Sequence, residues 1–327
     1  MSITFPHIFI FLSIIITIFL FRENKPYIFG VVLISVSLLF LDLPDIDEYR
    51  THYDLTGTHG FDYVTSLYNF EPGYVFFVII MSSIFTFEVF YIVTISLAIH
   101  AYLNFFRDSG EGRHYVYAAF FLPICLYFIA FTLRTTLASI FLVYAIMCLK
   151  RNRNVAATAL IIVGAMFHIV IAPMIILPVV KRFSVIIAKY YIFIFILLGA
   201  LSIIAAQGLS LTSLVGVNDI IDLKISSYDD ANIKSNSFYF VLWIVALILS
   251  LVPLKSFSDF DRVLSVSLVI IILLLYPFQF IQGRFMWLTS FLFAYFFTKS
   301  TLMRFNFGET GRVVLVCLLP LAVFSRI

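Results

Sequence analysis

The chain has 327 residues, of which 62% are hydrophobic, 18% aromatic and only 12% charged. A soluble domain carries roughly a quarter charged residues, and no water-soluble core of this length hides so much apolar surface, so the composition predicts that the solvent is lipid. The net charge of +3 is too small to indicate nucleic-acid binding. The basic residues stand in short clusters between apolar runs, which is the pattern of membrane topology.

Apolar runs close to the length of about 20 residues that a membrane-spanning helix needs recur along the chain. We therefore expect an all-α, polytopic integral membrane protein with about ten to twelve transmembrane helices, some short or re-entrant, in a single transmembrane domain over residues 1–327. The candidate segments are 5–21, 26–43, 72–87, 89–106, 115–132, 135–149, 155–180, 190–206, 237–254, 263–282, 285–298 and 313–325. The first has neither a basic region before it nor a small-residue cleavage pattern after it, so we read it as a retained span.

Two long polar loops interrupt these segments, at about 44–71 and 207–236, and acidic residues dominate both. In the first loop, Asp45, Asp47 and Glu48 offer oxygen ligands for a divalent cation, although a solvated acidic loop has the same composition. We read the aromatic residues of this loop as an interfacial belt. The seven-residue spacing of its two histidines, His52 and His59, is poor for chelating a metal.

Glu71 ends the first loop and directly precedes Pro72 at the mouth of the next span. Proline suits the first helical turn, and an acidic residue there complements the helix dipole. The same carboxylate is alternatively a general base or a sugar ligand, and the sequence leaves both interpretations open.

Basic clusters predict the orientation of the chain. Residues 150–153, 181–189 and 299–312 each carry several Lys and Arg and should be cytoplasmic, whereas the two acidic loops should be external. If residues 72–106 formed two complete spans, the next two spans, 115–132 and 135–149, would bring residues 150–153 to the outside. That would break the positive-inside rule. One segment between 72 and 149 is therefore expected to be re-entrant or miscounted.

Arg134 lies in FIAFTLRTTLASIFL, with apolar sequence on both sides. A charge near the bilayer centre costs about 2.5–3.5 kcal/mol on insertion scales, so it needs an interior partner or a polar cavity. The guanidinium suits bidentate contact with a phosphate. The alternative is a residue at a helix boundary that snorkels to the lipid headgroups.

His168 lies in a run that is too long for one span and contains Pro173 and Pro178. This pattern predicts two short helices that meet near His168, where broken backbone lines a cavity. A neutral imidazole there could accept a proton from a hydroxyl. The alternative is a buried histidine that hydrogen-bonds to a neighbouring helix.

Arg284 lies between two late spans on the expected external side, against the positive-inside bias, which favours a ligand role. Gln279 and Gln282 add polar side chains at helical spacing. The cysteines Cys125, Cys148 and Cys317 lie in apolar runs without CxxC spacing, so we read them as packing residues. The sequence contains no P-loop, GxGxxG, HExxH or GxSxG motif.

Several of these positions together resemble a known family. The anchors are Asp45 and Tyr49 after the second span, F-E-P-G-Y over residues 70–74, L-R-x-x-L-A around Arg134, F-H at 167–168 and Arg284 before an aromatic span. They resemble the EpsG-type group of polysaccharide polymerases, and size and external loops also suit the broader O-antigen polymerase (Wzy) class. Two positions depart from the family pattern: Thr135 stands where Gln is usual after the arginine, and Leu43-Pro44 replaces a basic-Gly pair before Asp45.

The resemblance implies a membrane glycosyltransferase that moves a glycan from undecaprenyl pyrophosphate to a lipid-linked repeat unit, at the periplasmic face of the bacterial inner membrane. Its expected partners are undecaprenyl-pyrophosphate-linked oligosaccharides, the lipid bilayer and a chain-length regulator protein. The donor supplies the driving force, so no cofactor is expected. The alternatives are a membrane glycosyltransferase that uses a lipid-phosphate sugar, a polysaccharide flippase or transporter, and an acyltransferase.

The same resemblance implies roles for individual residues. The acceptor hydroxyl needs a base, and the leaving pyrophosphate needs fixed positive charge. The candidate bases are His168 and Glu71. The candidate ligands of the pyrophosphate or the glycan are Arg134, Arg284, Asp45, Tyr49 and Arg50.

Overall fold

The computed structural model describes residues 5–23, 25–41, 43, 45–67, 70–109, 114–183, 258–275 and 279–292, with single positions between 185 and 197 and between 294 and 299. Every element in this part of the chain is helical, which confirms the all-α class. The predicted external loop at 207–236 and the predicted spans at 237–254 and 313–325 lie outside the described residues. The chain divides after Ala172 into two compact units. That the whole chain is one transmembrane domain stays a prediction.

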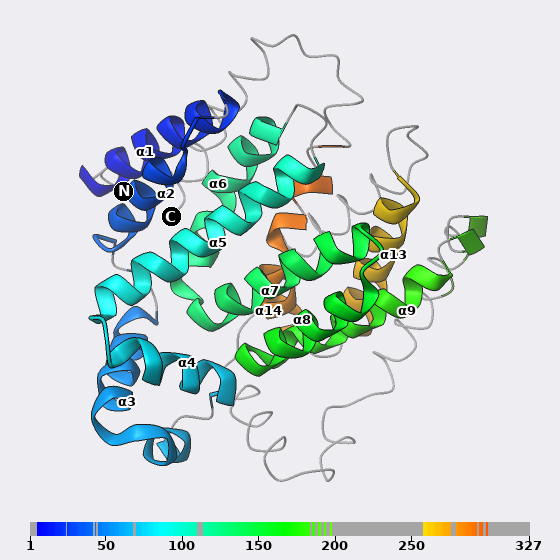
Figure 1. The fold of residues 1–327 in the computed structure, drawn as a ribbon. Coiled ribbons are helices and arrows are strands. Elements are labelled where there is room, and N and C mark those ends of the chain that lie inside the picture. The colour runs from blue at the N-terminus through cyan, green and yellow to red at the C-terminus, as the bar shows by residue number, and fades with distance from the viewer. Residues whose placement is uncertain are drawn as a thin grey trace. The chain divides into compact units, whose positions relative to one another are not determined.

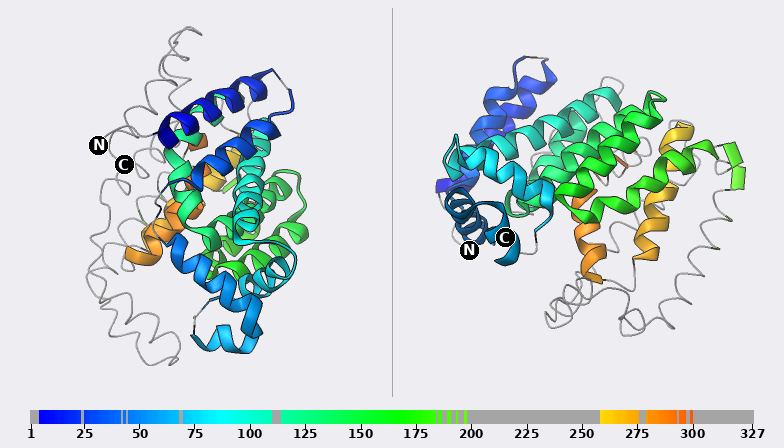
Figure 2. Two further views of the ribbon diagram at one scale, coloured as in Figure 1. Left: turned by 90° about the vertical axis from the view of Figure 1, so that its left-hand side faces the viewer. Right: turned by 60° about the horizontal axis from the view of Figure 1, so that its bottom comes forward.

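The first unit holds eight described helices and the start of a ninth element (Figure 1). The helices are α1 (Phe5–Arg22), α2 (Ile28–Leu38), α3 (Ile46–Leu67), α4 (Pro72–Ser82), α5 (Phe87–Ser109), α6 (His114–Phe131), α7 (Leu133–Lys150) and α8 (Asn154–Phe167), followed by the 3-10 helix η1 (Ile169–Ile175). α1 and α2 lie side by side, as both views of Figure 2 show in dark blue. α5 packs against α2, α6 and α7, and α7 pairs along its length with α8.

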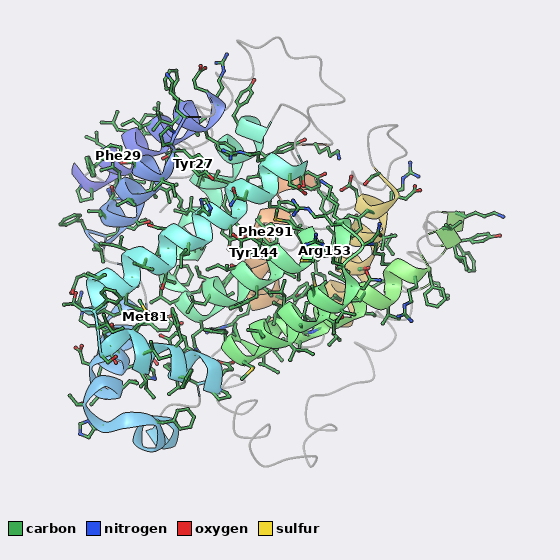
Figure 3. All side chains as sticks on the ribbon, viewed as in Figure 1. Tyr27, Phe29, Met81, Tyr144, Arg153 and Phe291 are labelled. Atoms are coloured by element: carbon green, nitrogen blue, oxygen red, sulfur yellow. The ribbon has the colours of Figure 1, made fainter. Side chains whose placement is uncertain are left out.

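Polar contacts tie several of these helices together. The hydroxyl of Tyr27, labelled in Figure 3, lies 3.2 Å from Nδ1 of His100 and so connects the start of α2 to α5. α7 and α8 are joined by the basic turn at 150–153, in which Asn152 has a φ of 61°. Asparagine tolerates this left-handed conformation better than most residues, so it suits the tight reversal.

Two helices among the described residues, α5 with 23 residues and α7 with 18, are long and apolar enough to cross a membrane. α2, α4 and α8 are also apolar but shorter. This helical, apolar character is that of a membrane protein. The number of ten to twelve passes stays a prediction.

α4 has only 11 residues, which at 1.5 Å per residue span about 16 Å. The hydrocarbon core is about 30 Å thick. α5, α6 and α7, with 23, 18 and 18 residues, span about 27–35 Å. Of the helices between residues 72 and 149, α4 is therefore the one that is too short to cross.

Residues 46–67, which we expected to lie in a loop, form the 22-residue helix α3. Tyr49, His52, Tyr53 and Thr56 are buried, and their spacing of three, four and seven residues places them on one helical face. The acidic residues at 47, 48 and 54 are exposed. α3 packs through this polar-aromatic face against α4.

The second unit contains α9 (Ile176–Arg182), α13 (Asp259–Leu274) and α14 (Gln279–Leu288). α9 packs on α13. Lys299, which we assigned to a basic cytoplasmic cluster, is buried and donates to the Asp261 carboxylate at 2.9 Å and to the Tyr295 hydroxyl at 2.8 Å. A buried ion pair therefore joins α13 to the segment that carries Tyr295 and Lys299.

Candidate active site

Glu71 lies in the connection between α3 and α4, at the N-cap position of α4. Its backbone is extended (φ −67°, ψ 141°), and Pro72 occupies the first helical turn, as the sequence predicted. The side chain makes no capping hydrogen bond to α4. Its carboxylate is instead directed to two other helices.

One carboxylate joins three elements of the first unit. Oε2 of Glu71 accepts a hydrogen bond from Nη1 of Arg134, in the first turn of α7, at 2.9 Å. Oε1 accepts from Nδ1 of His168, at the end of α8, at 3.0 Å and from the backbone N–H of Ile169 at 3.4 Å. The exposed fractions of the three side chains are 8% for Glu71, 13% for Arg134 and 6% for His168. The structure therefore assembles a nearly dry cluster of carboxylate, guanidinium and imidazole.

The backbone around His168 explains how this side chain reaches the cluster. α8 ends at Phe167, His168 is extended (φ −158°, ψ 117°), and η1 begins at Ile169. The predicted break of the 155–180 run into two short segments that meet at His168 is confirmed. Because the chain leaves the helix at this residue, the ring points toward Glu71 instead of following the surface of α8.

Two glycines permit the close packing that brings α4, α7 and α8 together. A Cβ on Gly73 would lie 2.7 Å from the carbonyl oxygen of Met166, so α4 approaches the backbone of α8 directly. A Cβ on Gly164 would lie 2.8 Å from Cδ1 of Ile171 and 3.1 Å from Cβ of Phe141 on α7. Real Cβ atoms do not approach backbone this closely, so the site geometry depends on glycine at residue 73.

Aromatic side chains from α3, from α4 and from the connection between them lie around the guanidinium of Arg134. The Phe70 ring centre lies 4.0 Å from Cζ of Arg134, within the range of a cation–π contact. The side chain of Tyr49 also interacts with this guanidinium. His52 packs on Phe70 and Tyr74 with ring centres 4.4 and 5.6 Å away. These rings hold the arginine side chain in one orientation.

The electrostatics of the cluster follow from its burial and its pairing. Burial alone would raise the pKa of Glu71, but the hydrogen bond from His168 and the charge of Arg134 outweigh it and lower this pKa to about 2. Burial and the positive charge of Arg134 lower the pKa of His52 to about 4. At neutral pH Glu71 is therefore an anion and His52 is uncharged.

A model of the EpsG family matches residues 27–325. The chain belongs to the EpsG family. This match confirms the resemblance inferred from the anchors between residues 45 and 290, and Glu71, Arg134 and His168 all lie inside it. No curated protein and no solved structure matches the chain.

Of the other residues of the first unit that we named as candidates in this EpsG-family chain, Tyr49 joins the cluster, whereas Arg50 and Asp45 do not. Arg50 is exposed and pairs with Glu88 on α5, with its guanidinium 4.9 Å from the Phe87 ring centre. Asp45 is exposed, has a φ of 64° and accepts a hydrogen bond from the backbone N–H of Tyr49 at the start of α3. Within the described residues, no group of three His, Cys, Asp or Glu side chains could hold a metal ion.

Arg284 belongs to the second unit, where it lies half-buried on α14. The neighbouring Gln282 is buried and donates to the carbonyl of Ile272 at 2.9 Å. This glutamine connects α14 to α13 and so has a structural contact of its own.

The contacts of His52, Phe70 and Tyr74 around Arg134 were not predicted from the sequence. We read the aromatic residues as an interfacial belt and set His52 aside as a poor chelator. The signal that would have found them is the helical spacing of Tyr49, His52, Tyr53 and Thr56. This spacing puts the four side chains on one polar-aromatic face of a helix. That face packs on Phe70, in the connection before α4, and on Tyr74 of α4.

Proposed function

We propose that this EpsG-family protein is a polysaccharide polymerase. It transfers a glycan from undecaprenyl pyrophosphate to the end of a lipid-linked repeat unit. The observation that carries the proposal is the contact of one carboxylate with both Arg134 and His168, within a chain that belongs to the family. Together these side chains offer a proton acceptor and a fixed positive charge, the two groups that the reaction needs.

In the proposed reaction, the acceptor hydroxyl oxygen attacks the anomeric carbon of the donor. A new C–O bond forms while the bond from that carbon to the pyrophosphate oxygen breaks, and the bonding electrons leave with the pyrophosphate. The hydroxyl proton passes to His168. Because Nδ1 of His168 faces Glu71, a proton on Nδ1 leaves Nε2 as the nitrogen that accepts.

Between the two candidate bases, the electrostatics favour His168. The pKa of Glu71, at about 2, makes this carboxylate a weak base at neutral pH. Both of its oxygens also accept hydrogen bonds from the protein. An imidazole titrates near neutral pH when unperturbed, with a pKa of about 6.5, and so suits general base catalysis.

Arg134 supports the leaving group in this proposal. Its Nη1 is engaged by Glu71, but the buried Nε–H has no hydrogen-bond partner among the described residues. A buried donor without a partner costs about 1–3 kcal/mol. A pyrophosphate oxygen on the Nε edge of the guanidinium would remove this cost and would bring the charge-assisted contact that arginine makes with phosphates.

The helix lengths support a topology in which this chemistry takes place at the outer face. If α4 enters and leaves on the same side, then α5, α6 and α7 are three crossings between the acidic segment 44–71 and the basic turn 150–153. The acidic segment is then outside and the basic turn inside, as the positive-inside rule requires. Glu71 and the start of α7, which carries Arg134, both lie at the outer ends of their helices, the periplasmic side of a bacterial inner membrane.

Two experiments test the proposal. In a strain without the protein, surface polysaccharide should stop at a single repeat unit on a gel, whereas complete loss of glycan would indicate an earlier step. Purified protein with lipid-linked repeat units should produce polymer, with or without EDTA. Loss of turnover in EDTA would favour a metal-dependent glycosyltransferase. Polymer that forms normally in the absence of the protein would reject the proposal.

A further inference from the structure

The carboxylate of Glu71 serves two partners at once, through different oxygens. Oε1 accepts from Nδ1 of His168 and from the backbone N–H of Ile169, while Oε2 accepts from Arg134. We propose that Glu71 is a positioning residue with two tasks: it holds the imidazole of His168 in its working tautomer, and it is the counter-ion on Arg134 that the donor pyrophosphate displaces. This inference rests on the proposed function and goes beyond it, because it makes donor binding a competition inside the protein.

The competition follows from the burial of Arg134. A buried guanidinium without an anion is costly, so some counter-ion must be present before the donor arrives. Glu71 supplies it at 2.9 Å in a cluster where the most exposed side chain, Arg134, is 13% exposed. A pyrophosphate carries more negative charge than a carboxylate and, on the Nε edge, competes with Glu71 for the same guanidinium and repels its carboxylate. Its binding therefore weakens the contact between Oε2 and Nη1.

Release of Oε2 does not release Glu71. Oε1 keeps two donors, Nδ1 of His168 and the backbone N–H of Ile169, and both lie at the end of α8. The carboxylate thus stays on the histidine while the guanidinium pairs with the donor. The two tasks are separable, because each uses its own oxygen.

Neutralising Glu71 should accordingly affect donor binding and turnover in opposite directions. In Glu71→Gln an NH2 donor replaces one of the two oxygens, so only one of His168 and Arg134 still faces an acceptor. The competing charge on Arg134 is gone, so donor binding should tighten. The orientation of His168 is weakened, so turnover should fall. If Glu71 only stabilised the fold, its neutralisation would not tighten donor binding while lowering turnover.

The first measurement needs no catalysis. Inorganic pyrophosphate, titrated into purified protein in detergent and followed by calorimetry, should bind Glu71→Gln about threefold to tenfold more tightly than wild type. Arg134→Gln should abolish this binding. Asp108→Asn is the matched control, since Asp108 also pairs with basic side chains, Lys150 and Arg151, but at the other end of α7. It should bind pyrophosphate like wild type.

The second measurement separates KM from kcat in polymerisation. Glu71→Gln should lower kcat by about 10²-fold or more, with the donor KM unchanged or reduced. The double variant Glu71→Gln/His168→Gln should be no slower than His168→Gln alone, because the glutamate acts through the histidine. Weaker pyrophosphate binding in Glu71→Gln, or a double variant that shows the product of both losses, would overturn the inference.

Glu71→Asp covers the case in which the glutamine variant does not accumulate. It keeps the charge, but its side chain is one methylene shorter and cannot bridge partners on two helices. It should therefore change either the donor KM or kcat without the other, and wild-type values of both would overturn the inference. If wild type binds pyrophosphate as described but forms no polymer, the proposed function fails while the competition stands. If wild type forms polymer and the Glu71 variants do not separate the effect on the donor KM from the effect on kcat, only this inference fails.

Discussion

Oε1 of Glu71 lies 3.0 Å from Nδ1 of His168, although 97 residues separate the two in the chain. The contact exists because α8 ends at Phe167 and the extended backbone of His168 turns its ring toward the N-cap of α4. Arg134, on a third helix, completes the cluster through the other oxygen of the same carboxylate. The two residues that sequence reasoning offered as alternative bases are thus partners in one site.

His168→Gln tests the base. Glutamine keeps the polarity and a hydrogen bond to Glu71 but cannot accept and release a proton as imidazole does. The variant should stay inserted and bind donor, while polymer formation falls by about 10²–10⁴-fold, the usual contribution of general acid–base catalysis. Turnover by purified protein at matched amounts measures this. Near-normal turnover would remove His168 from the mechanism.

Arg134→Lys tests the guanidinium. A lysine can still pair with Glu71, so the fold should persist, but it lacks the planar Nε edge that we assign to the pyrophosphate. Polymer formation should fall by at least about tenfold, mainly through a higher donor KM. Arg151→Lys, an exposed arginine that pairs with Asp108, is the control and should keep full activity. Equal activity of both variants would show that Arg134 contributes only its charge.

The pH dependence should report His168 rather than its neighbours. Glu71 is ionised above pH 4 because its pKa is lowered to about 2, and His52 is neutral above pH 5 because its pKa is lowered to about 4. The other side chains that face the cluster are arginine and tyrosines, residue types whose ordinary pKa values lie well above the range of about pH 5 to 8. An acid-side fall of kcat within that range should therefore be present in wild type and absent from the residual activity of His168→Gln. An acid limb that persists in the variant would contradict the assignment.

Glu71 also predicts how stability depends on pH. Its folded-state pKa of about 2 lies below its unfolded value of about 4.3, so the ionised carboxylate stabilises the fold above that unfolded value. This contribution is lost as the pH falls through 4 toward 2. The difference in melting temperature between wild type and Glu71→Gln should shrink as the pH falls from about 4 toward 2. A difference that grows on acidification would mean that Glu71 is protonated in the folded protein.

Gly73→Ala tests the packing that positions Glu71. The added Cβ would lie 2.7 Å from both Cβ and the carbonyl oxygen of Met166, so α4 and α8 must separate. The strain should cost about 1–3 kcal/mol and should lower turnover by moving Glu71 away from His168. Gly283→Ala, whose Cβ would meet nothing within 4 Å, is the control and should behave like wild type. Unchanged turnover in Gly73→Ala would show that the approach of α4 is not required.

Cysteine labelling tests whether α4 returns to the side from which it enters. Thr58 on α3 and Ser83 at the end of α4 are exposed, as is Val155 at the start of α8. In intact spheroplasts a membrane-impermeant maleimide should label cysteines at Thr58 and Ser83 but not at Val155. Protection at Ser83 with labelling at Thr58 would mean that α4 crosses. Labelling at Val155 alone would reverse the orientation.

The secondary structure around the site was partly readable from the sequence. The break at His168 followed from the length of the apolar run and from its two prolines, and the structure confirms it. α3 was equally readable, because Tyr49, His52, Tyr53 and Thr56 recur with helical spacing. We gave more weight to its polar composition and expected a loop. The helix forms because one face of it is buried against α4, and composition alone does not contain that information.

By itself, the sequence determined the membrane character, the all-helical class and the family, because apolar content, run length and short motifs are local properties of the chain. It also identified Glu71, Arg134 and His168 as polar side chains in or beside apolar runs, where they need a partner or a function. Only the tertiary structure decided that these three meet, that Arg50 pairs with Glu88 instead, and that Glu71 is ionised. Such contacts join residues 63 and 97 positions apart, and they depend on how closely α4, α7 and α8 pack, which no local pattern specifies.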